Sequence, residues 1–325
     1  MFRKHCRWVV AAIVVVLAPS ALCQAPGYPS KSIRFVVPFP PGGVTDRMAR
    51  LLSGHMQESW RQPVVVDNRP GGSGFIASQA VAGAPPDGHT LLMGNINTHA
   101  INSSLYRKLP YDPVKDFAPI SLLVSVPNLL LVHPSVPANS VQELVALARS
   151  RPGSLSFASG GSGTSSHMSA ELLKSMTGID IVHIPYKGPG PALQDTLSGQ
   201  VDMYFDTIAS TLPQVRAGRL RALAITSPAR SSLAPEIATM AESGMPGYDV
   251  APWFGALTRA GTPPEIVARL NAEMVRILNL PEVRATLAAQ GVTIIAGTPD
   301  GFAKYIDQEI ARWAKVVRET GAKAE

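Results

Sequence analysis

The sequence predicts an α/β fold built from two doubly wound lobes. Short apolar runs alternate with longer amphipathic segments along nearly the whole chain, a pattern typical of sheets covered by helices. The length of 325 residues leaves room for two domains, since one domain takes about 150 residues. Apolar runs near 121–132 and 250–258 are expected to cross between the lobes as two crossing strands. The predicted lobes are therefore 24–125 with 251–325, and 126–250.

Strands are expected where a short apolar run ends at glycine, proline or polar turn residues. They are expected at 33–38, 64–67, 90–93, 120–126, 129–132, 155–158, 179–184, 201–205, 220–226, 250–258 and 292–295. Because amphipathic segments separate most of these runs, parallel sheets are expected.

Helices are expected where apolar residues recur every three or four positions. They are expected at 45–59, 75–82, 141–149, 168–176, 191–198, 212–217, 235–243, 263–278, 283–290 and 299–320, with a further helix possible around 102–106. Ser73 is a candidate cap for the helix at 75–82, since a serine hydroxyl can accept from a first-turn N–H.

Residues 1–23 are predicted to be a signal peptide. Three basic residues precede an apolar run at 8–18, which is too short to span a bilayer as a helix of about 20 residues. Small residues near Cys23 favour cleavage before Gln24. Two alternatives are an uncleaved membrane anchor and lipidation of Cys23, although Leu22 stands where a lipoprotein would carry a small residue.

Both cysteines, Cys6 and Cys23, fall within this leader, so the mature chain would have no disulfide and no thiol chemistry. The formal net charge of +6 includes three basic residues of the leader, which leaves the mature chain only mildly positive. Such a charge suits acidic ligands. It is too small and too scattered to indicate nucleic-acid binding.

Two glycine-rich loops connect a predicted strand to a predicted helix. One runs from Phe39 to Thr45 and the other from Ser159 to Ser166. Glycine lets main-chain N–H groups approach a ligand, and the first N–H groups of a helix have no intrahelical partner. Each loop can therefore hold an anion without lysine or arginine. Two such loops predict two jaws around one small acid, although each alone could be a flexible turn with a helix cap.

Five ordered motifs resemble those of the tripartite tricarboxylate transporter substrate-binding receptors, or Bug proteins. They are 28–43 with Pro40-Pro41-Gly42-Gly43, Asp67-Asn68-Arg69-Pro70-Gly71, Pro86-Asp87-Gly88-His89-Thr90, Ser159-Gly160-Gly161-Ser162-Gly163-Thr164 with His167, and Ile184-Pro185-Tyr186-Lys187-Gly188. The resemblance implies a type II periplasmic binding-protein fold that closes on a small carboxylate. It also implies that main-chain groups of the two loops hold one ligand carboxylate, with water bridges holding the rest.

The partners expected from this resemblance are a small carboxylate ligand and integral-membrane transporter subunits, and the expected location is the periplasm. No cofactor, metal or nucleic acid is expected, and the mature protein is expected to be monomeric. The predicted ligand-binding residues are Phe39, Pro41, Gly42, Gly43, Thr45, Asn95, Ser159, Gly161, Gly163, Thr164, His167, Tyr186 and Asp206.

Several of these residues have other interpretations. His167 could contact the ligand or cap its helix, and a metal site with Glu171 would need a third ligand that the sequence does not indicate. Asp46 is interpreted as a helix-dipole partner. Asp206 could bind an amino group or a water molecule.

The best enzyme alternative is a secreted serine hydrolase that uses Ser159 or Ser162 with His167. The sequence has no complete Gly-x-Ser-x-Gly elbow, no nucleotide-binding P-loop and no His-Glu-x-x-His motif. A third class is a receptor that signals to a sensor protein instead of supplying a transporter.

Overall fold

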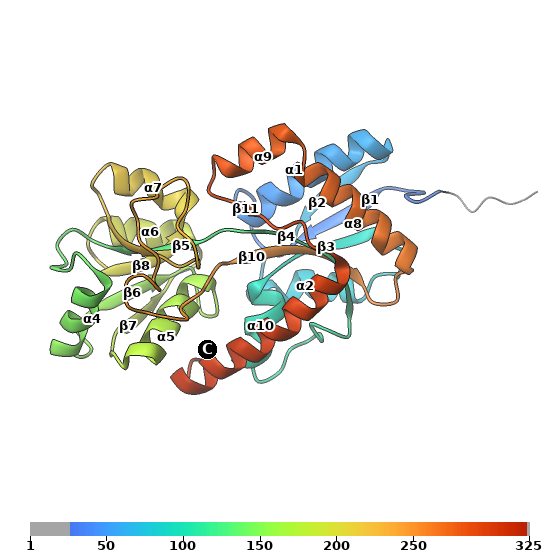
Figure 1. Ribbon diagram of the computed structural model, residues 1–325. Helices are drawn as coiled ribbons and strands as arrows, with labels where there is room; N and C mark the ends of the chain where they lie inside the picture. The colour runs from blue at the N-terminus through green and yellow to red at the C-terminus, as the bar shows by residue number, and fades with distance from the viewer. Residues whose placement is uncertain (1–26, 324–325) are drawn as a thin grey trace, which may run out of the picture.

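The computed structural model describes residues 27–323, which form two α/β lobes, each built on its own sheet (Figure 1). The predicted signal peptide, both cysteines and the predicted cleavage site at Gln24 lie outside the described residues. No helix in residues 27–323 is long and apolar enough to cross a membrane.

The first lobe contains a six-stranded sheet in the order β11-β4-β10-β3-β1-β2. Its strands are β1 (Ile33–Val37), β2 (Val64–Asn68), β3 (Thr90–Asn95), β4 (Phe117–Ser125), β10 (Trp253–Arg259) and β11 (Thr293–Ile294). The second lobe contains a five-stranded sheet in the order β7-β6-β8-β5-β9. Its strands are β5 (Asn128–Val132), β6 (Ser156–Ser159), β7 (Val182–Pro185), β8 (Met203–Thr207) and β9 (Arg221–Ile225).

Helices cover both sheets. They are α1 (Val44–Trp60), α2 (Phe75–Ala82), α3 (Asn102–Leu105), α4 (Val141–Ser150), α5 (Ser165–Thr177), α6 (Pro189–Leu197), α7 (Ile208–Arg216), α8 (Pro264–Leu278), α9 (Pro281–Ala288) and α10 (Pro299–Thr320). A 3₁₀ turn, η1 (Gly72–Gly74), precedes α2, and a π-helical turn, η2 (Asn97–Ile101), precedes α3.

The sheets are mixed, which corrects the expectation of purely parallel sheets. In the first lobe β1 pairs in parallel with β2 and β3, whereas β10 runs antiparallel to β3 and β4, and β11 runs antiparallel to β4. In the second lobe β5 runs antiparallel to β8 and β9. The reason is topological: β5 and β10 each enter their sheet from the other lobe instead of returning through a helix of their own.

Two chain crossings join the lobes. The chain passes from β4 to β5 through residues 126–127 and returns from β9 to β10 (Figure 1). Helix α10, drawn in red, packs against β4 and η2 of the first lobe and against α5 of the second lobe. The lobe boundaries at 125/126 and 250/251 stay a prediction.

Helix α10 is anchored on β10 through one buried carboxylate. Glu309 Oε2 accepts a hydrogen bond from Trp253 Nε1 on β10 and another from Trp313 Nε1 on α10, each at 3.1 Å. Arg312 Nη1 lies 3.1 Å from the other oxygen, Oε1. Both indole rings are fully buried, so this cluster fixes the long terminal helix beside the crossing strand.

Two local predictions are wrong. Residues 235–243 form turns and not a helix, because Ile225 N donates to Ala238 O and Met240 N donates to Ile225 O, which holds the segment beside β9. Ser73 does not cap α2: Gly74 is the N-cap residue and no side chain accepts there. The Ser73 hydroxyl lies 2.7 Å from the Tyr106 hydroxyl instead.

Candidate functional site

The first glycine loop connects β1 to α1 and is braced by Asp46. The Asp46 carboxylate accepts hydrogen bonds from Gly42 N (2.9 Å), Arg50 Nε (3.0 Å) and Asn68 Nδ2 (3.0 Å). Asn68 Nδ2 also donates to Phe39 O at 3.1 Å. Asp46 and Asn68 therefore fold the loop back onto the end of β2.

This role explains the charge state of Asp46. Burial alone would raise the pKa of Asp46, but hydrogen bonds from Arg50, from the Gly42 N–H and from Asn68 outweigh burial and hold the pKa below its usual value. The carboxylate stays ionised at neutral pH. Asp46 was interpreted from the sequence as a helix-dipole partner, and the structure adds a loop-bracing role.

The N-terminus of α1 keeps unclaimed hydrogen-bond donors. Gly43 is the N-cap residue, and no side chain caps the helix. The main-chain N–H groups of residues 43–46 donate to no acceptor within residues 27–323. Pro41, Gly42 and Gly43 are exposed, Phe39 and Val44 are half-buried, and Thr45 is buried. An anion could approach these N–H groups from solvent.

The second glycine loop connects β6 to α5, and its glycines turn their N–H groups inward. Gly160 N donates to Ser166 Oγ, Gly161 N to Ser159 Oγ and Gly163 N to His167 Nδ1, each at 3.1 Å. Gly161 and Gly163 have φ values of +125° and +79°, which favour glycine. These three N–H groups are therefore bonded within the second lobe, which corrects the expectation that they face the ligand.

The donors that remain in this loop belong to serines. The main-chain N–H groups of Ser162, Ser165 and Ser166 donate to no acceptor within the described part of the chain. Thr164 is the N-cap residue of α5, and its hydroxyl accepts from His167 N at 3.5 Å and donates to Gly161 O at 2.7 Å. The Thr164 hydroxyl thus fixes the loop, and its predicted contact with a ligand stays a prediction.

Ser159 belongs to the framework of the loop. Its side chain is fully buried and its Oγ lies 2.6 Å from His183 Nε2. The histidine that contacts Ser159 is thus His183 and not His167, on which the hydrolase interpretation depended. A nucleophile must reach its substrate, so the complete burial of Ser159 weighs against that interpretation.

His167 and His183 stack in a small aromatic cluster beneath the loop. Their ring centroids lie 4.0 Å apart with planes 15° from parallel, and Phe157 stacks on His183 at 4.8 Å. Burial lowers the pKa of His167 to about 3, helped by the charges of His183 and Lys174, and lowers that of His183 to about 4, helped by Lys174. Both imidazoles are therefore neutral at physiological pH.

The first lobe contacts the second loop directly. Asn97 Nδ2 of η2 donates to the carbonyl of Gly163, and Leu105 of α3 packs against the same glycine, where an added Cβ would meet Leu105 Cδ2 at 2.5 Å. Asn95, at the end of β3, positions Asn97: Asn95 Oδ1 accepts from the N–H groups of Asn97 and Thr98, each at 3.1 Å. Asn95 therefore orients the start of η2, which makes the interlobe contact.

Tyr186 and Asp206 lie at the ends of β7 and β8. The Tyr186 hydroxyl donates to Asp195 Oδ2 on α6 at 2.7 Å, and burial together with Asp195 raises the pKa of Tyr186 to about 12. Asp206 is nearly buried and accepts from Thr207 N (2.7 Å) and Ser210 Oγ (2.8 Å). Burial raises the pKa of Asp206 to about 6 against the effect of these bonds.

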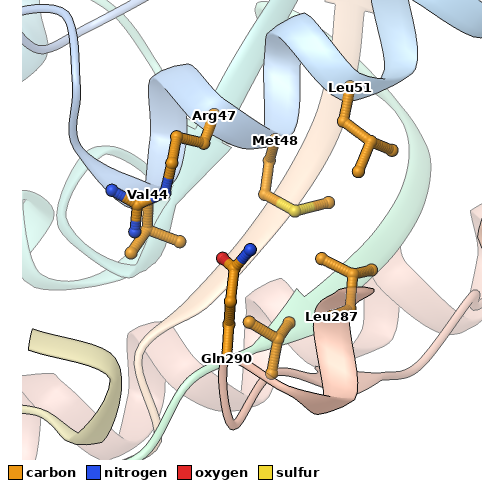
Figure 2. A pocket seen from close by; sticks show the side chains of 7 residues that line it. Val44, Arg47, Met48, Leu51, Leu287 and Gln290 are labelled. Carbon is orange, nitrogen blue, oxygen red and sulfur yellow. The ribbon is translucent and has the colours of Figure 1, made fainter. Parts of the chain in front are cut away.

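Two hollows are present, one beside the first turns of α1 and one at the far end of α5. A pocket of about 30 Å³, the room of one or two water molecules, lies between α1 and α9, where Leu287 and Gln290 point toward Val44 and Met48 (Figure 2). A groove of about 390 Å³ lies near Gly178 at the far end of α5. The 13 residues of α5 place that groove about 20 Å from the second loop.

Three residues of this site were missed from the sequence: Asn97, Ser166 and His183. His183 is a polar residue within an apolar strand, and Asn97 lies two residues after the end of β3. Those were the available signals. Within residues 27–323 no group of three or more histidine, cysteine, aspartate or glutamate side chains could hold a metal.

Comparison with known proteins places the chain in a family. The model of the tripartite tricarboxylate transporter family receptor matches residues 48–322. The chain belongs to this family. Protein BugT of Bordetella pertussis is 41% identical to this receptor over 316 residues, which is 97% of each chain. The family predicted from the five motifs is thus confirmed.

Solved structures confirm the fold. R. palustris Rpa4515 with adipate has a TM-score of 0.84 at 39% identity, over 92% of this receptor and 100% of that chain. MatC from Rhodopseudomonas palustris with bound malate has a TM-score of 0.81 at 37% identity, over 89% and 100%. The periplasmic binding protein BugD has a TM-score of 0.81 at 32% identity, over 92% and 100%. The receptor therefore has the two-lobed periplasmic binding-protein fold.

Proposed function

We propose that this receptor binds a small carboxylate between its lobes and delivers it to the membrane subunits of a tripartite tricarboxylate-type transporter. One observation carries the proposal: the two glycine loops and the first turns of the helices that follow them retain unclaimed main-chain N–H groups, at residues 43–46 and at Ser162, Ser165 and Ser166. Helix N-termini favour anions through these N–H groups and the helix dipole.

The relatives support the chemical class of the ligand. Two structures with the same fold at 37–39% identity contain adipate and malate, which are both dicarboxylates. A charge-assisted hydrogen bond contributes about 1.5–3 kcal/mol. Four or five such bonds, less the cost of association and lobe closure, give a dissociation constant on the order of micromolar.

The candidate residues below are proposed to have three different roles. Pro41, Gly42 and Gly43 form the exposed rim of the first loop, and together with the half-buried Phe39 they are proposed to contact the ligand. Asp206 is proposed to contact the far end of the ligand through a water molecule that donates to it, because each of its carboxylate oxygens accepts only one hydrogen bond within residues 27–323. Ser159, Gly161, Gly163, Thr164 and His167 then shape the second loop.

Membership of the family supports the proposed partners and location. The mature chain, from Gln24, is proposed to be a periplasmic monomer that binds without chemical turnover. Transport and signalling remain two different roles for such a receptor. Deletion of the membrane subunits separates them: loss of uptake of the bound carboxylate supports transport, and a retained ligand response without uptake supports sensing.

The test is a binding screen on the purified mature protein. Mono-, di- and tricarboxylates, amino acids and aromatic acids are compared by thermal shift, with adipamide as the matched neutral control for adipate. A ligand at a hundred times its dissociation constant adds about 2.7 kcal/mol of stability. Stabilisation by acids and not by adipamide supports the proposal. No stabilisation by any acid, together with no small acid released by denaturing extraction, would overturn it.

A further inference from the structure

We propose that His167 and His183 are positioning residues of the second glycine loop. As a stacked pair, they carry their protons on opposite ring nitrogens and accept the hydrogen bonds that fix Ser159 and Gly163. This inference rests on the proposed function only in the statement that the loop binds a ligand. The geometry of the pair is independent of any ligand.

The tautomer of His167 follows from its hydrogen bonds. Gly163 N donates to His167 Nδ1 at 3.1 Å, so Nδ1 carries a lone pair and the ring proton lies on Nε2. His167 Nε2 faces Glu171 Oε1 at 3.7 Å, and Lys174 Nζ lies 2.9 Å from the same oxygen. A proton on Nε2 points toward the buried carboxylate of Glu171. Nδ1 then remains the acceptor atom and faces the loop.

The tautomer of His183 follows from Ser159. Ser159 Oγ accepts from Gly161 N at 3.1 Å, and the hydroxyl lies 2.6 Å from His183 Nε2. The hydroxyl is fully buried, and its proton has no other acceptor within residues 27–323. Donation to His183 Nε2 therefore satisfies the hydroxyl and places the ring proton on Nδ1.

These bonds decide which donors of the loop face a ligand. His183, through Ser159, holds the Gly161 N–H inward, and His167 holds the Gly163 N–H inward. Because the peptides of Gly161 and Gly163 are fixed, the intervening Ser162 peptide keeps its N–H unclaimed. The imidazole pair thus preorganises the loop and reduces the ordering cost of binding.

The pair has to be neutral to do this. A proton on His167 Nδ1 or on His183 Nε2 would replace an acceptor by a donor. The charged groups facing the pair are Glu171 and Lys174, both on α5, and the rings are 4.0 Å apart, so that one charged ring disfavours charge on the other.

The first test is spectroscopic and uses the ligand-free mature protein. Long-range ¹H–¹⁵N correlation spectra at pH 7 distinguish protonated from unprotonated ring nitrogens. The expected result is an unprotonated Nδ1 in His167 and an unprotonated Nε2 in His183. The same tautomer in both rings, or a charged ring, would overturn the proposal even if no carboxylate binds.

The second test uses substitutions, with adipate and malate as probes. His183→Phe and His167→Phe keep an aromatic ring but lose the acceptor, and are expected to weaken binding about tenfold or more. His183→Gln and His167→Asn keep an amide oxygen near the lost acceptor and should restore part of the affinity. His55→Asn, on the outer part of α1, is the matched control.

The outcomes separate the two proposals. Unchanged affinity in both phenylalanine variants would overturn the positioning role. If the wild-type receptor binds neither probe, faster amide hydrogen exchange at Gly161 in His183→Phe than in His183→Gln still supports the positioning role. Equal exchange in the two variants would contradict it.

Discussion

Asn97 of the first lobe donates a hydrogen bond to the carbonyl of Gly163 in the second. The N–H of the same glycine is held by His167 within the second lobe. The peptide groups around Gly163 are therefore fixed from both lobes at once. This arrangement links the shape of the ligand-binding loop to the relative position of the lobes, and ligand can favour closure only through contacts that reach both.

Asn97→Ala should weaken ligand binding by about two- to tenfold, because one net hydrogen bond contributes about 0.5–1.5 kcal/mol. Isothermal titration with the carboxylate that the screen identifies measures this change. Asn279→Ala is the matched control, since Asn279 is exposed beyond the end of α8. Equal affinities of the two variants would contradict a role for the interlobe bond.

Gly43→Val should abolish binding while leaving the fold intact. Gly43 has φ −74°, and an added Cβ would meet no atom within 4 Å, so the branched side chain fills only the space in front of the α1 N-terminus. Gly54→Val, at an exposed glycine of the same helix with equal room, controls for the effect of valine on α1. Retained binding in Gly43→Val, measured by thermal shift, would exclude the first loop as a jaw.

Gly161→Val is expected to be a less selective substitution than Gly43→Val. Gly161 has φ +125°, and its Cβ would lie 3.3 Å from Tyr186 O. The variant should therefore lose stability as well as binding. Thermal unfolding of the ligand-free protein measures this loss, and a midpoint equal to that of Gly43→Val would show that the loop tolerates the strain.

Acid should destabilise the receptor below about pH 6.5. The pKa values of His99, His167 and His183 are lowered to about 3, 3 and 4 by burial, so the unfolded chain takes up protons there that the folded chain does not. Above the pKa of histidine in the unfolded chain, the free energy of unfolding keeps its full value. As the pH falls from there toward the pKa values of the folded protein, the free energy of unfolding decreases by up to about 1.4 kcal/mol per pH unit for each histidine.

Two carboxyl groups with raised pKa values act in the opposite direction. Burial raises the pKa values of Asp206, to about 6, and of Asp249, so the folded protein binds those protons more readily than the unfolded chain. On unfolding, the three histidines take up protons and the two carboxyl groups release them. The unfolding reaction therefore has a net proton uptake between about pH 4 and 6. Urea unfolding at pH 7.5 and 5 measures the difference, and equal stability at both would contradict the assignment of neutral buried histidines.

Asp206→Asn should change how malate binding depends on pH. Wild-type Asp206 becomes charged as the pH rises through about 6, and a charged carboxylate repels a dianion. The ratio of wild-type to variant affinity should therefore fall between pH 5.5 and 7.5, and the titration of malate itself cancels in that ratio. Asp300→Asn, at the start of α10, is the control. A constant ratio would place Asp206 away from the ligand.

Much of the fold could be predicted because its signals are local. Apolar periodicity located α2 and α10 to the residue, and the first strand was expected to begin at Ile33, where β1 begins. The antiparallel strands β5 and β10 could not be derived from periodicity, because strand direction depends on which lobe the chain has come from. The turns at 235–243 were missed because their backbone hydrogen bonds go to Ile225 of β9, which lies outside the segment and does not affect its local periodicity.

The sequence located the two loops of the site, but it did not show which main-chain N–H groups of those loops are free to bind a ligand. Glycine content indicated where the backbone approaches a ligand, whereas the direction of each N–H depends on side chains that fold beneath the loop. His183 comes from the neighbouring strand β7, and its contact with Ser159 arises only from the parallel pairing of β6 and β7. Asn97 comes from the other lobe.

The most direct test of two main-chain jaws is an amide titration by ¹H–¹⁵N spectroscopy of the mature protein with adipate or malate, whichever binds in the screen. The amides of residues 43–46 and of Ser162, Ser165 and Ser166 should shift together and saturate with one dissociation constant. The inward Gly161 and Gly163 amides should keep their hydrogen-bonded signatures. Shifts confined to one loop, or the largest shifts at Gly161 and Gly163, would contradict the account.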